Sequence, residues 1–217
     1  MPLLRACLPL LLPLVVPALL PAQEAGFVVL RGADTVATER YTPGSPVWKG
    51  RLEIRKQPRP QLEEWSVVRA PEGPAALLEV TESEPPQAAR EKPRIIQRSR
   101  VIFRGDSVAI DAVTNGGLVT RLYGTTEGAM PYLNLSFGLI DLTLDEARRR
   151  MGGSAAPVKV PLFNLGGGQT ADATVTLDGT RGTMQVGAVR YDLELLPNGR
   201  LAGAAIPAQG LRAVRVP

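Results

Sequence analysis

The chain has 217 residues, with 25 Lys or Arg and 21 Asp or Glu, which give a formal net charge of +4. It contains no histidine and one cysteine, Cys7. These two features exclude Ser-His-Asp and Cys-His catalysis, and they exclude zinc and copper sites built from histidine and cysteine. The mild charge, with basic and acidic residues interspersed, argues against a nucleic-acid partner.

Residues 1–22 combine one early positive charge, Arg5, with an almost unbroken apolar run. This arrangement predicts a secretory signal peptide that is cleaved near Ala22, with Ala25 as the next candidate site. A retained membrane helix would need about 20 apolar residues without repeated prolines, and a lipoprotein would carry its cysteine after the apolar run. We therefore expect a periplasmic or extracellular protein, whose residues 23–217 contain no disulfide and no transmembrane segment.

Residues 26–126 form a first block of short β-like stretches that are separated by turn residues. Trp48, Leu52 and Ile54 share one parity and charged residues hold the other, which is typical of a strand with one buried face. Asn115–Gly117 is the strongest tight-turn signal. Eight strands are expected, over residues 27–31, 35–41, 48–55, 62–69, 75–81, 94–104, 107–113 and 118–123.

The pattern changes over residues 131–151, where apolar residues recur three or four positions apart. This spacing predicts a helical insert, either one kinked helix or two short helices. Thr143 and Glu146 match a capping box and therefore predict a helix start inside the insert. Arg148–Arg150 and the following Gly152-Gly153 mark its end.

Strands resume over residues 158–216. Tyr191, Leu193 and Leu195 alternate with charged residues in the clearest strand of the chain. The short connections predict antiparallel neighbours. Six strands are expected, over residues 158–165, 171–177, 183–186, 189–195, 201–206 and 211–216. The sequence leaves open whether the two strand blocks share one sheet.

A sheet of a dozen or more strands does not stay flat, because its twist curls it into a barrel, a half-barrel or a sandwich. We therefore expect a mainly β, single domain over residues 23–217. It would be a curved antiparallel sheet, half-barrel or barrel-like, with one inserted helical segment around 131–151. The helix would cover an apolar groove that suits a hydrophobic ligand. Five inward residues, core positions first and ligand contacts second, would line the groove: Trp48, Leu52, Ile54, Tyr191 and Leu193.

No pattern identifies a catalytic, cofactor or metal residue. Gly166–Ala171 matches a dinucleotide-binding loop by letters, but a β-like stretch follows where such a loop needs a helix. Asp141 and Asp145 would lie one helical turn apart, a spacing that suits a hard cation. Capping explains Glu146 without a metal. A carboxylate pair for hydrolysis would come together only in space.

Four arginines share one face of an expected strand with Ile96 and Ile102, namely Arg94, Arg98, Arg100 and Arg104. Such a stripe is typical of a solvated outer sheet face, where charges discourage edge pairing. Contact with anionic lipid head groups is the alternative interpretation.

Phe27–Arg40 resembles the first hairpin of uncharacterised secreted bacterial β-rich domains, some of which stand alone and some of which precede hydrolase domains. Asn198–Leu211 resembles their closing hairpin, and the architecture is similar to periplasmic lipoprotein-carrier half-barrels. Together with the absence of catalytic motifs, this predicts an exported, non-enzymatic domain that binds a hydrophobic ligand, a lipid or an envelope protein partner, without a cofactor. The alternatives are a carboxylate-dependent hydrolase or its accessory domain, and a structural cell-envelope protein.

Overall fold

The computed structural model of the chain describes residues 24–55, 59–70, 73–86 and 91–217. The expected signal peptide, residues 1–22, lies outside these residues together with Cys7. The signal peptide, its cleavage and the export that it implies therefore stay predictions.

The first strand block forms a meander in which each strand pairs antiparallel with the next. Its eight strands are β1 (Ala25–Arg31), β2 (Asp34–Thr42), β3 (Val47–Ile54), β4 (Gln61–Arg69), β5 (Ala75–Glu84), β6 (Arg94–Arg104), β7 (Ser107–Thr114) and β8 (Gly117–Gly124).

The second part begins with a short strand and a helix, β9 (Met130–Tyr132) and α1 (Phe137–Met151). The strands that follow are β10 (Val158–Asn164), β11 (Gln169–Asp178), β12 (Arg181–Val186), β13 (Val189–Leu195), β14 (Leu201–Ile206) and β15 (Leu211–Val216). A single 3-10 turn, η1 (Pro207–Gln209), joins β14 to β15.

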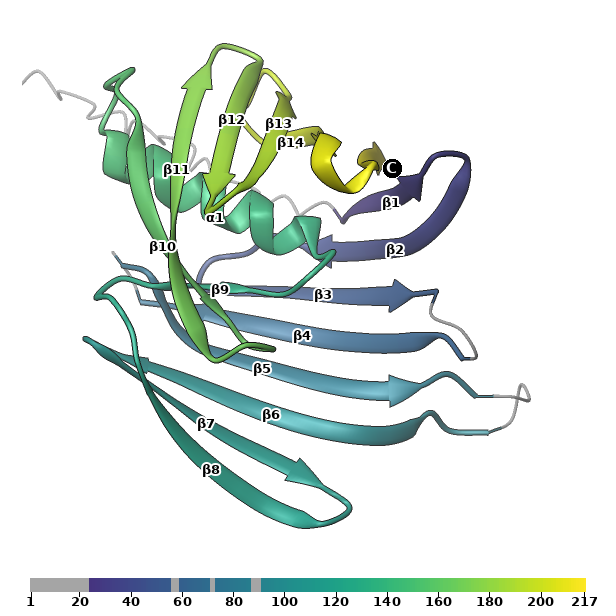
Figure 1. Cartoon of the computed structure of the whole chain (residues 1–217). Coiled ribbons are helices and arrows are strands. Elements are labelled where there is room, and N and C mark those ends of the chain that lie inside the picture. Colours follow the sequence, from purple (N-terminus) through teal and green to yellow (C-terminus); the bar gives the residue numbers. More distant parts are fainter. Residues whose placement is uncertain (1–23, 56–58, 71–72, 87–90) are drawn as a thin grey trace, which may run out of the picture.

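Within the described residues, both strand blocks belong to one open, curved sheet of 15 strands, which confirms the expected fold class (Figure 1). The strand order is β8-β7-β6-β5-β4-β3-β2-β1-β15-β14-β13-β12-β11-β10-β9. The blocks are joined by the antiparallel pair β1–β15, in which Gly26 lies opposite Val216. One pair departs from the expected antiparallel order, because β9 and β10 are parallel. The intervening helix α1 supplies the long crossover that a parallel pair needs.

The helix starts earlier than the expected capping box indicates, so that prediction is wrong. The N-cap is Ser136, whose Oγ accepts a hydrogen bond from the Leu139 N–H at 3.3 Å. Thr143 lies inside the helix and donates its hydroxyl hydrogen to the Leu139 carbonyl at 2.9 Å. The first residues of the expected insert belong to β9 instead, because residues 130–132 pair with β10.

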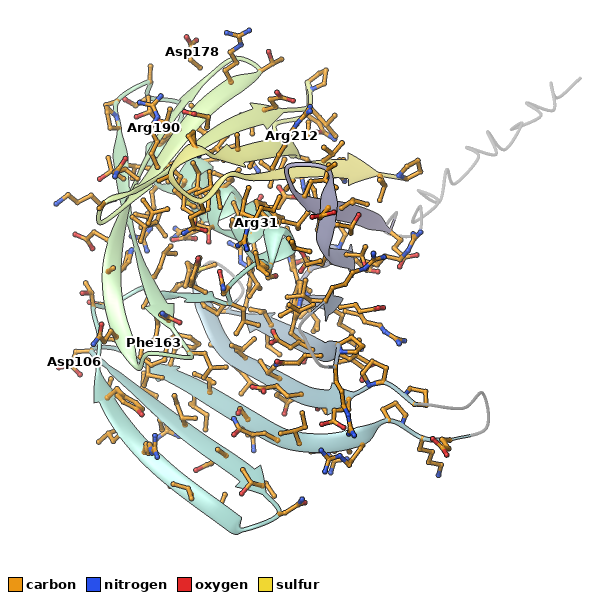
Figure 2. All side chains as sticks on the ribbon, turned by 45° about the vertical axis from the view of Figure 1, so that its right-hand side comes forward. Arg31, Asp106, Phe163, Asp178, Arg190 and Arg212 are labelled. Carbon is orange, nitrogen blue, oxygen red and sulfur yellow. The ribbon has the colours of Figure 1, made fainter. Side chains whose placement is uncertain are left out.

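The sheet curls around α1, so the protein core lies between the two halves of the sheet (Figure 1). Phe163 of β10 points into this interior (Figure 2). Its ring lies 6.1 Å from the Phe103 ring and 5.9 Å from the Tyr123 ring, between centroids. The Thr125 and Thr170 hydroxyls also meet, at 2.6 Å. These contacts hold the two ends of the open sheet near each other.

A helix that crosses a lipid bilayer must be both long and apolar. In the part of the chain that the structure describes, no helix combines these two properties.

Candidate functional site

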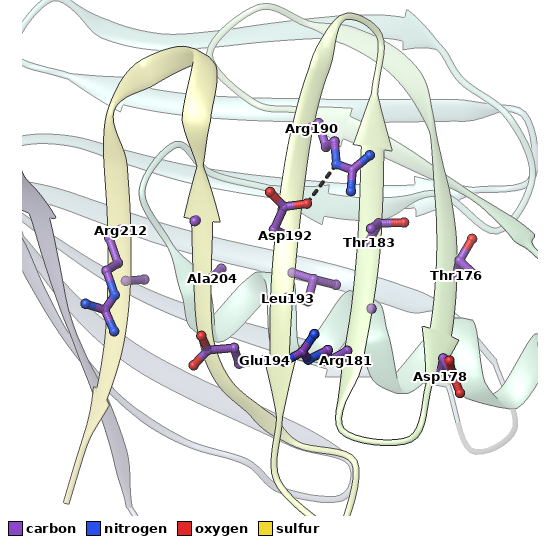
Figure 3. A pocket seen from close by; sticks show the side chains of 13 residues that line it. Thr176, Asp178, Arg181, Thr183, Arg190, Asp192, Leu193, Glu194, Ala204 and Arg212 are labelled. Carbon is purple, nitrogen blue, oxygen red and sulfur yellow. Dashed lines mark hydrogen bonds and ion pairs between the residues drawn. The ribbon is translucent and has the colours of Figure 1, made fainter.

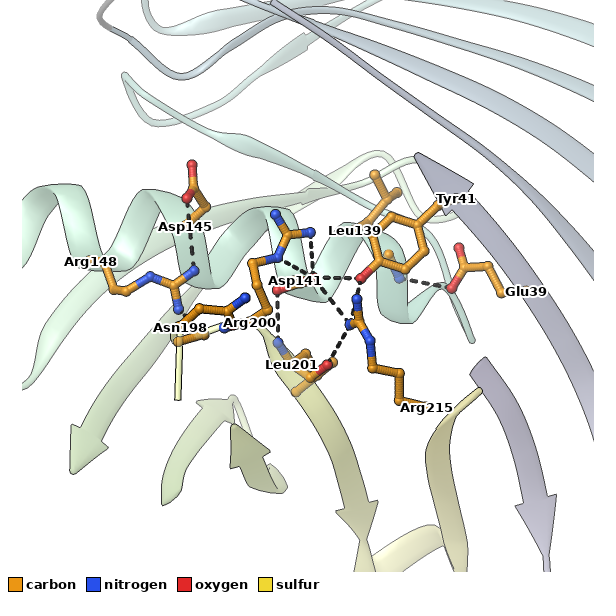
Figure 4. A network of polar contacts seen from close by, with 12 residues as sticks. Glu39, Tyr41, Leu139, Asp141, Asp145, Arg148, Asn198, Arg200, Leu201 and Arg215 are labelled. Atoms are coloured by element: carbon orange, nitrogen blue, oxygen red, sulfur yellow. Dashed lines mark hydrogen bonds and ion pairs between the residues drawn. The ribbon is translucent and has the colours of Figure 1, made fainter. Parts of the chain in front are cut away.

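A buried polar network fixes α1 to the inner face of the sheet (Figure 4). The Asp141 carboxylate accepts hydrogen bonds from Tyr41 Oη at 2.5 Å, Arg200 Nε at 2.9 Å and the Leu201 N–H at 3.0 Å. Arg215 Nη1 lies 4.0 Å from the same carboxylate. Burial, and then the charge of Asp141, raises the pKa of the Tyr41 hydroxyl, so this hydroxyl stays a donor. Asp141 is thus saturated by protein groups.

A second buried carboxyl, Glu39 of β2, lies under the start of α1. It accepts hydrogen bonds from Ser136 Oγ at 2.6 Å, the Gly138 N–H at 2.8 Å and Trp65 Nε1 at 3.1 Å. Burial raises the pKa of Glu39 to about 7, and the three hydrogen bonds offset part of the effect. This carboxyl therefore changes its charge near neutral pH while it supports the helix start.

The remaining helix carboxylates are paired with arginines. Asp145 lies 2.5 Å from Arg69 Nη1. Glu146 accepts hydrogen bonds from Arg149 Nη2 at 2.6 Å and from Arg150 Nε at 2.7 Å. Burial opposes ionisation of Glu146, but these two arginines hold its pKa below the usual value. The described residues contain no group of three or more acidic, histidine or cysteine side chains arranged to hold a metal ion.

An open hollow of about 420 Å³ lies on the inner face of β3 to β8, beside the segment that leads into α1. Its apolar lining includes Ile54, Ile110, Ala112, Val119, Tyr123, Leu133, Leu135 and Leu165. Its polar lining includes Glu63, Glu82, Gln97, Ser99, Thr114, Arg121, Asn134 and Asn164. The hollow therefore offers both apolar surface and hydrogen-bonding groups.

The strand register brings the polar groups together. Glu63 of β4 lies opposite Glu82 of β5, which lies opposite Gln97 of β6, and Gln97 lies opposite Thr114 of β7. Side chains that face each other across antiparallel strands have Cβ atoms about 4.5–5.5 Å apart. Gln61 Nε2 donates hydrogen bonds to Glu63 Oε1 at 2.8 Å and to Glu82 Oε2 at 3.2 Å. The result is a polar row of four side chains across the floor of the hollow, which we call the polar row.

The five residues expected to line a groove lie in two different places. Ile54 lines the hollow. The other four, Trp48, Leu52, Tyr191 and Leu193, are buried in the hydrophobic core. The structure thus does not bring all five side chains to one cavity, and their contact with a ligand stays a prediction.

The polar row was not identified from the sequence, although one signal was available. Glu63 has the same parity as Trp65 and Val67 in β4, and both of these are buried on the inner face. A carboxylate on a core-facing surface needs a hydrogen-bonding or charged partner. The charged residue at this position was therefore the available signal of a polar site.

A second depression, of about 480 Å³, lies on the face of β11 to β15 that points away from α1 (Figure 3). Its lining includes three arginines and three acidic residues, namely Arg181, Arg190, Arg212, Asp178, Asp192 and Glu194. Arg190 Nε lies 2.7 Å from Asp192 Oδ1, and Arg181 lies opposite Glu194 in the register. The opposite charges balance, as on a solvated outer face, so the depression shows no preference for a charged ligand.

The arginine stripe of β6 is exposed. Arg94 forms an ion pair with Glu84 at 2.6 Å, and Arg100 lies 4.0 Å from Glu79. Exposed pairs of this kind contribute little to stability.

Of these three surfaces, the hollow on the inner face is therefore the candidate site.

The comparisons with known proteins give a likeness of fold. No protein-family model matches the chain, and no curated protein matches it. A solved structure of a DUF1089 family protein from Pseudomonas aeruginosa is similar, with a TM-score of 0.53 and 11% sequence identity. The similarity covers 82% of this chain and 92% of that protein. It supports the β-rich architecture, whereas none of these comparisons confirms the resemblance to lipoprotein carriers.

Proposed function

We propose that this chain binds a small amphipathic molecule, of the lipid class, in the hollow on its inner face. The observation that carries the proposal is a change of character along one surface. Beneath α1, the inner face is closed by apolar core residues and by the buried network that holds the helix. Beyond α1, β3 to β8 border open space of about 420 Å³ with mixed polar and apolar side chains. Ligand sites typically combine apolar walls with a few convergent polar groups.

The side chains that line the hollow indicate which chemical groups the ligand carries. The carboxylates and the Gln97 amide of the polar row suit hydroxyl or amine groups, which donate hydrogen bonds to carboxylate and carbonyl oxygens. Ile110, Val119 and Leu165 offer an apolar wall for a hydrocarbon portion. The expected export of the chain and its resemblance to lipoprotein-carrier half-barrels agree with a lipid ligand in the cell envelope. The role is non-enzymatic in this proposal.

The proposal is tested by extracting purified protein with chloroform and methanol and analysing the extract by mass spectrometry. A lipid at near-equal stoichiometry is the expected result. Replacing Ala112 with Phe fills the hollow from its β7 wall, and it should reduce the bound lipid at least tenfold. The matched control is Ala109→Phe, on the same strand but on the opposite face. An empty wild-type protein, or equal lipid in the two variants, would contradict the proposal and leave a structural envelope role.

A second candidate function rests on one feature of the same hollow. Glu63 and Glu82 lie opposite each other on β4 and β5, and Gln61 Nε2 donates a hydrogen bond to each carboxylate. The two carboxyl groups are therefore neighbours, as the catalytic pair of a retaining glycoside hydrolase is. A panel of nitrophenyl glycosides tests it directly. If the wild-type protein hydrolyses a glycoside and both Glu63→Gln and Glu82→Gln abolish the hydrolysis, the enzymatic proposal is supported. If the wild-type protein hydrolyses none of them, the enzymatic proposal is wrong.

A further inference from the structure

The two ends of the sheet differ in how their edges are protected. β9 has three residues, includes Pro131 and is mostly buried. β8 has eight residues, no proline and an exposed surface along most of its length. Leu118 and Leu122 of β8 are 64% and 75% exposed. Natural proteins shorten, charge or cover such edges, since a free apolar edge strand pairs with other chains.

We propose that two copies of this chain pair through β8, antiparallel, about a two-fold axis at Thr120. Leu118 and Leu122 lie two residues on either side of Thr120, on the outer face of the sheet. In this register, Leu118 of each copy faces Leu122 of the other copy. A two-fold axis requires this reciprocity, in which residue i contacts j and j contacts i. The exposed leucines of β8 therefore complement themselves.

Neighbouring residues extend the match beyond the edge itself. On β7, Val113 lies directly opposite Leu118, and Ala109 lies opposite Leu122. Val113 is 49% exposed. Pairing the two edges would thus form two continuous apolar strips across four strands, each running from Val113 of one copy to Ala109 of the other.

The charge on β8 disfavours a neighbouring register. Arg121 is the single charged residue of β8. With the axis at Thr120, it faces Val119 of the other copy. An axis one residue later would place the two Arg121 side chains directly opposite each other, and like charges in that position destabilise a strand pair.

The edge has the size of a weak interface. The area that a strand of eight residues and one neighbouring row of side chains can bury lies at or below the low end of the roughly 1,200–2,000 Å² that stable interfaces bury. The expected dimer is therefore reversible, with a dissociation constant in the micromolar range or above. The pairing does not depend on any ligand in the hollow.

Sedimentation of the wild-type protein over a range of concentrations tests the association. A monomer–dimer equilibrium is expected, and Leu122→Lys should weaken it at least tenfold. Leu122 is 75% exposed, so this change leaves the monomer fold intact. The matched control is Ile95→Lys, which alters a 40% exposed residue of β6 and should leave the equilibrium unchanged. A wild-type monomer at every concentration, or a dimer insensitive to Leu122→Lys, overturns the proposal.

Disulfide formation tests the register, in the full chain carrying Cys7→Ser so that no native cysteine remains. Residues directly opposite in an antiparallel pair have Cα atoms about 4.5–5.5 Å apart, within the range that a disulfide spans. Thr120→Cys should therefore give a covalent dimer on mild oxidation. The two copies of Val119 would be displaced by two residues, about 8 Å apart, so Val119→Cys should not cross-link. Equal cross-linking of the two variants, or none, refutes the axis at Thr120.

Discussion

Replacing Glu39 with Gln should remove a pH dependence of stability. Burial raises the pKa of Glu39 from 4.5 to about 7 in the folded protein. Between these two values, the folded carboxyl holds a proton that the unfolded chain has released. Raising the pH then favours the unfolded state. The contribution of Glu39 to stability is therefore fully present below pH 4.5, and it is lost as the pH rises through 7.

The size of the effect follows from the two pKa values. The difference between 4.5 and about 7 corresponds to about 3 kcal/mol at 1.36 kcal/mol per unit. The amide that Glu39→Gln introduces would be neutral at every pH, so the variant would lack this dependence. The amide would also place a donor toward the Ser136 or Gly138 donors, at a pH-independent cost of about 1–2 kcal/mol. The stability difference between wild type and Glu39→Gln should thus fall by about 2–3 kcal/mol between pH 5 and pH 8.

Urea unfolding of both proteins at several pH values, followed by tryptophan fluorescence, measures this difference. Subtracting the two free energies of unfolding cancels the other titrating groups. The matched control is Glu64→Gln, which changes an exposed residue of β4 and should leave the unfolding curves unchanged. A difference between wild type and Glu39→Gln that is constant with pH, or that grows as the pH rises, would refute the reasoning.

Two further predictions concern how α1 is held, and urea unfolding at pH 7 measures both. Asp141→Asn removes the buried carboxylate that partly buried Arg200 and Arg215 face, and it should cost about 3 kcal/mol or more. Asp145→Asn, at a side chain that is 38% exposed, should cost less than about 1 kcal/mol. Equal costs would show that the buried network is not what anchors the helix. Gly138→Ala would place a Cβ 2.8 Å from Trp65 Cζ2 and should cost about 1–3 kcal/mol despite the higher helix propensity of Ala. The matched control is Gly124→Ala, whose Cβ would meet no atom within 4 Å and which should be neutral. A Gly138→Ala protein that is more stable than the wild type would disprove the close approach of Gly138 to Trp65.

The strands could be predicted because their signals are local. The alternation around Leu52 and around Leu193 correctly places both residues on buried faces. Asn115–Gly117 makes the expected turn between β7 and β8. The helix ends at Gly152, in a left-handed conformation with φ 57°, as its position after the arginines indicates. Each of these features depends on residues that are neighbours in the chain.

The start of the helix and the polar row were missed because they depend on contacts between distant segments. Glu39 supports the N-terminus of α1 from a strand that is 97 residues from Ser136. Glu146 has the residue type of a capping box, but arginines one turn later bind its carboxylate instead. Parity alone places Glu63 on the inner face. That Glu82 lies beside Glu63 follows only from the register between β4 and β5, which the sequence does not show.

The antiparallel pair β1–β15 sets the order in which this protein can be completed during synthesis. β1 to β8 emerge first as a half-sheet, while β15, which lies against the other side of β1, is made after the other 14 described strands. Contacts between such distant segments slow folding, and incomplete sheets expose apolar surface. The nascent half-sheet therefore needs a chaperone or a rapid supply of its second half, and its aggregation should depend on how soon β15 arrives.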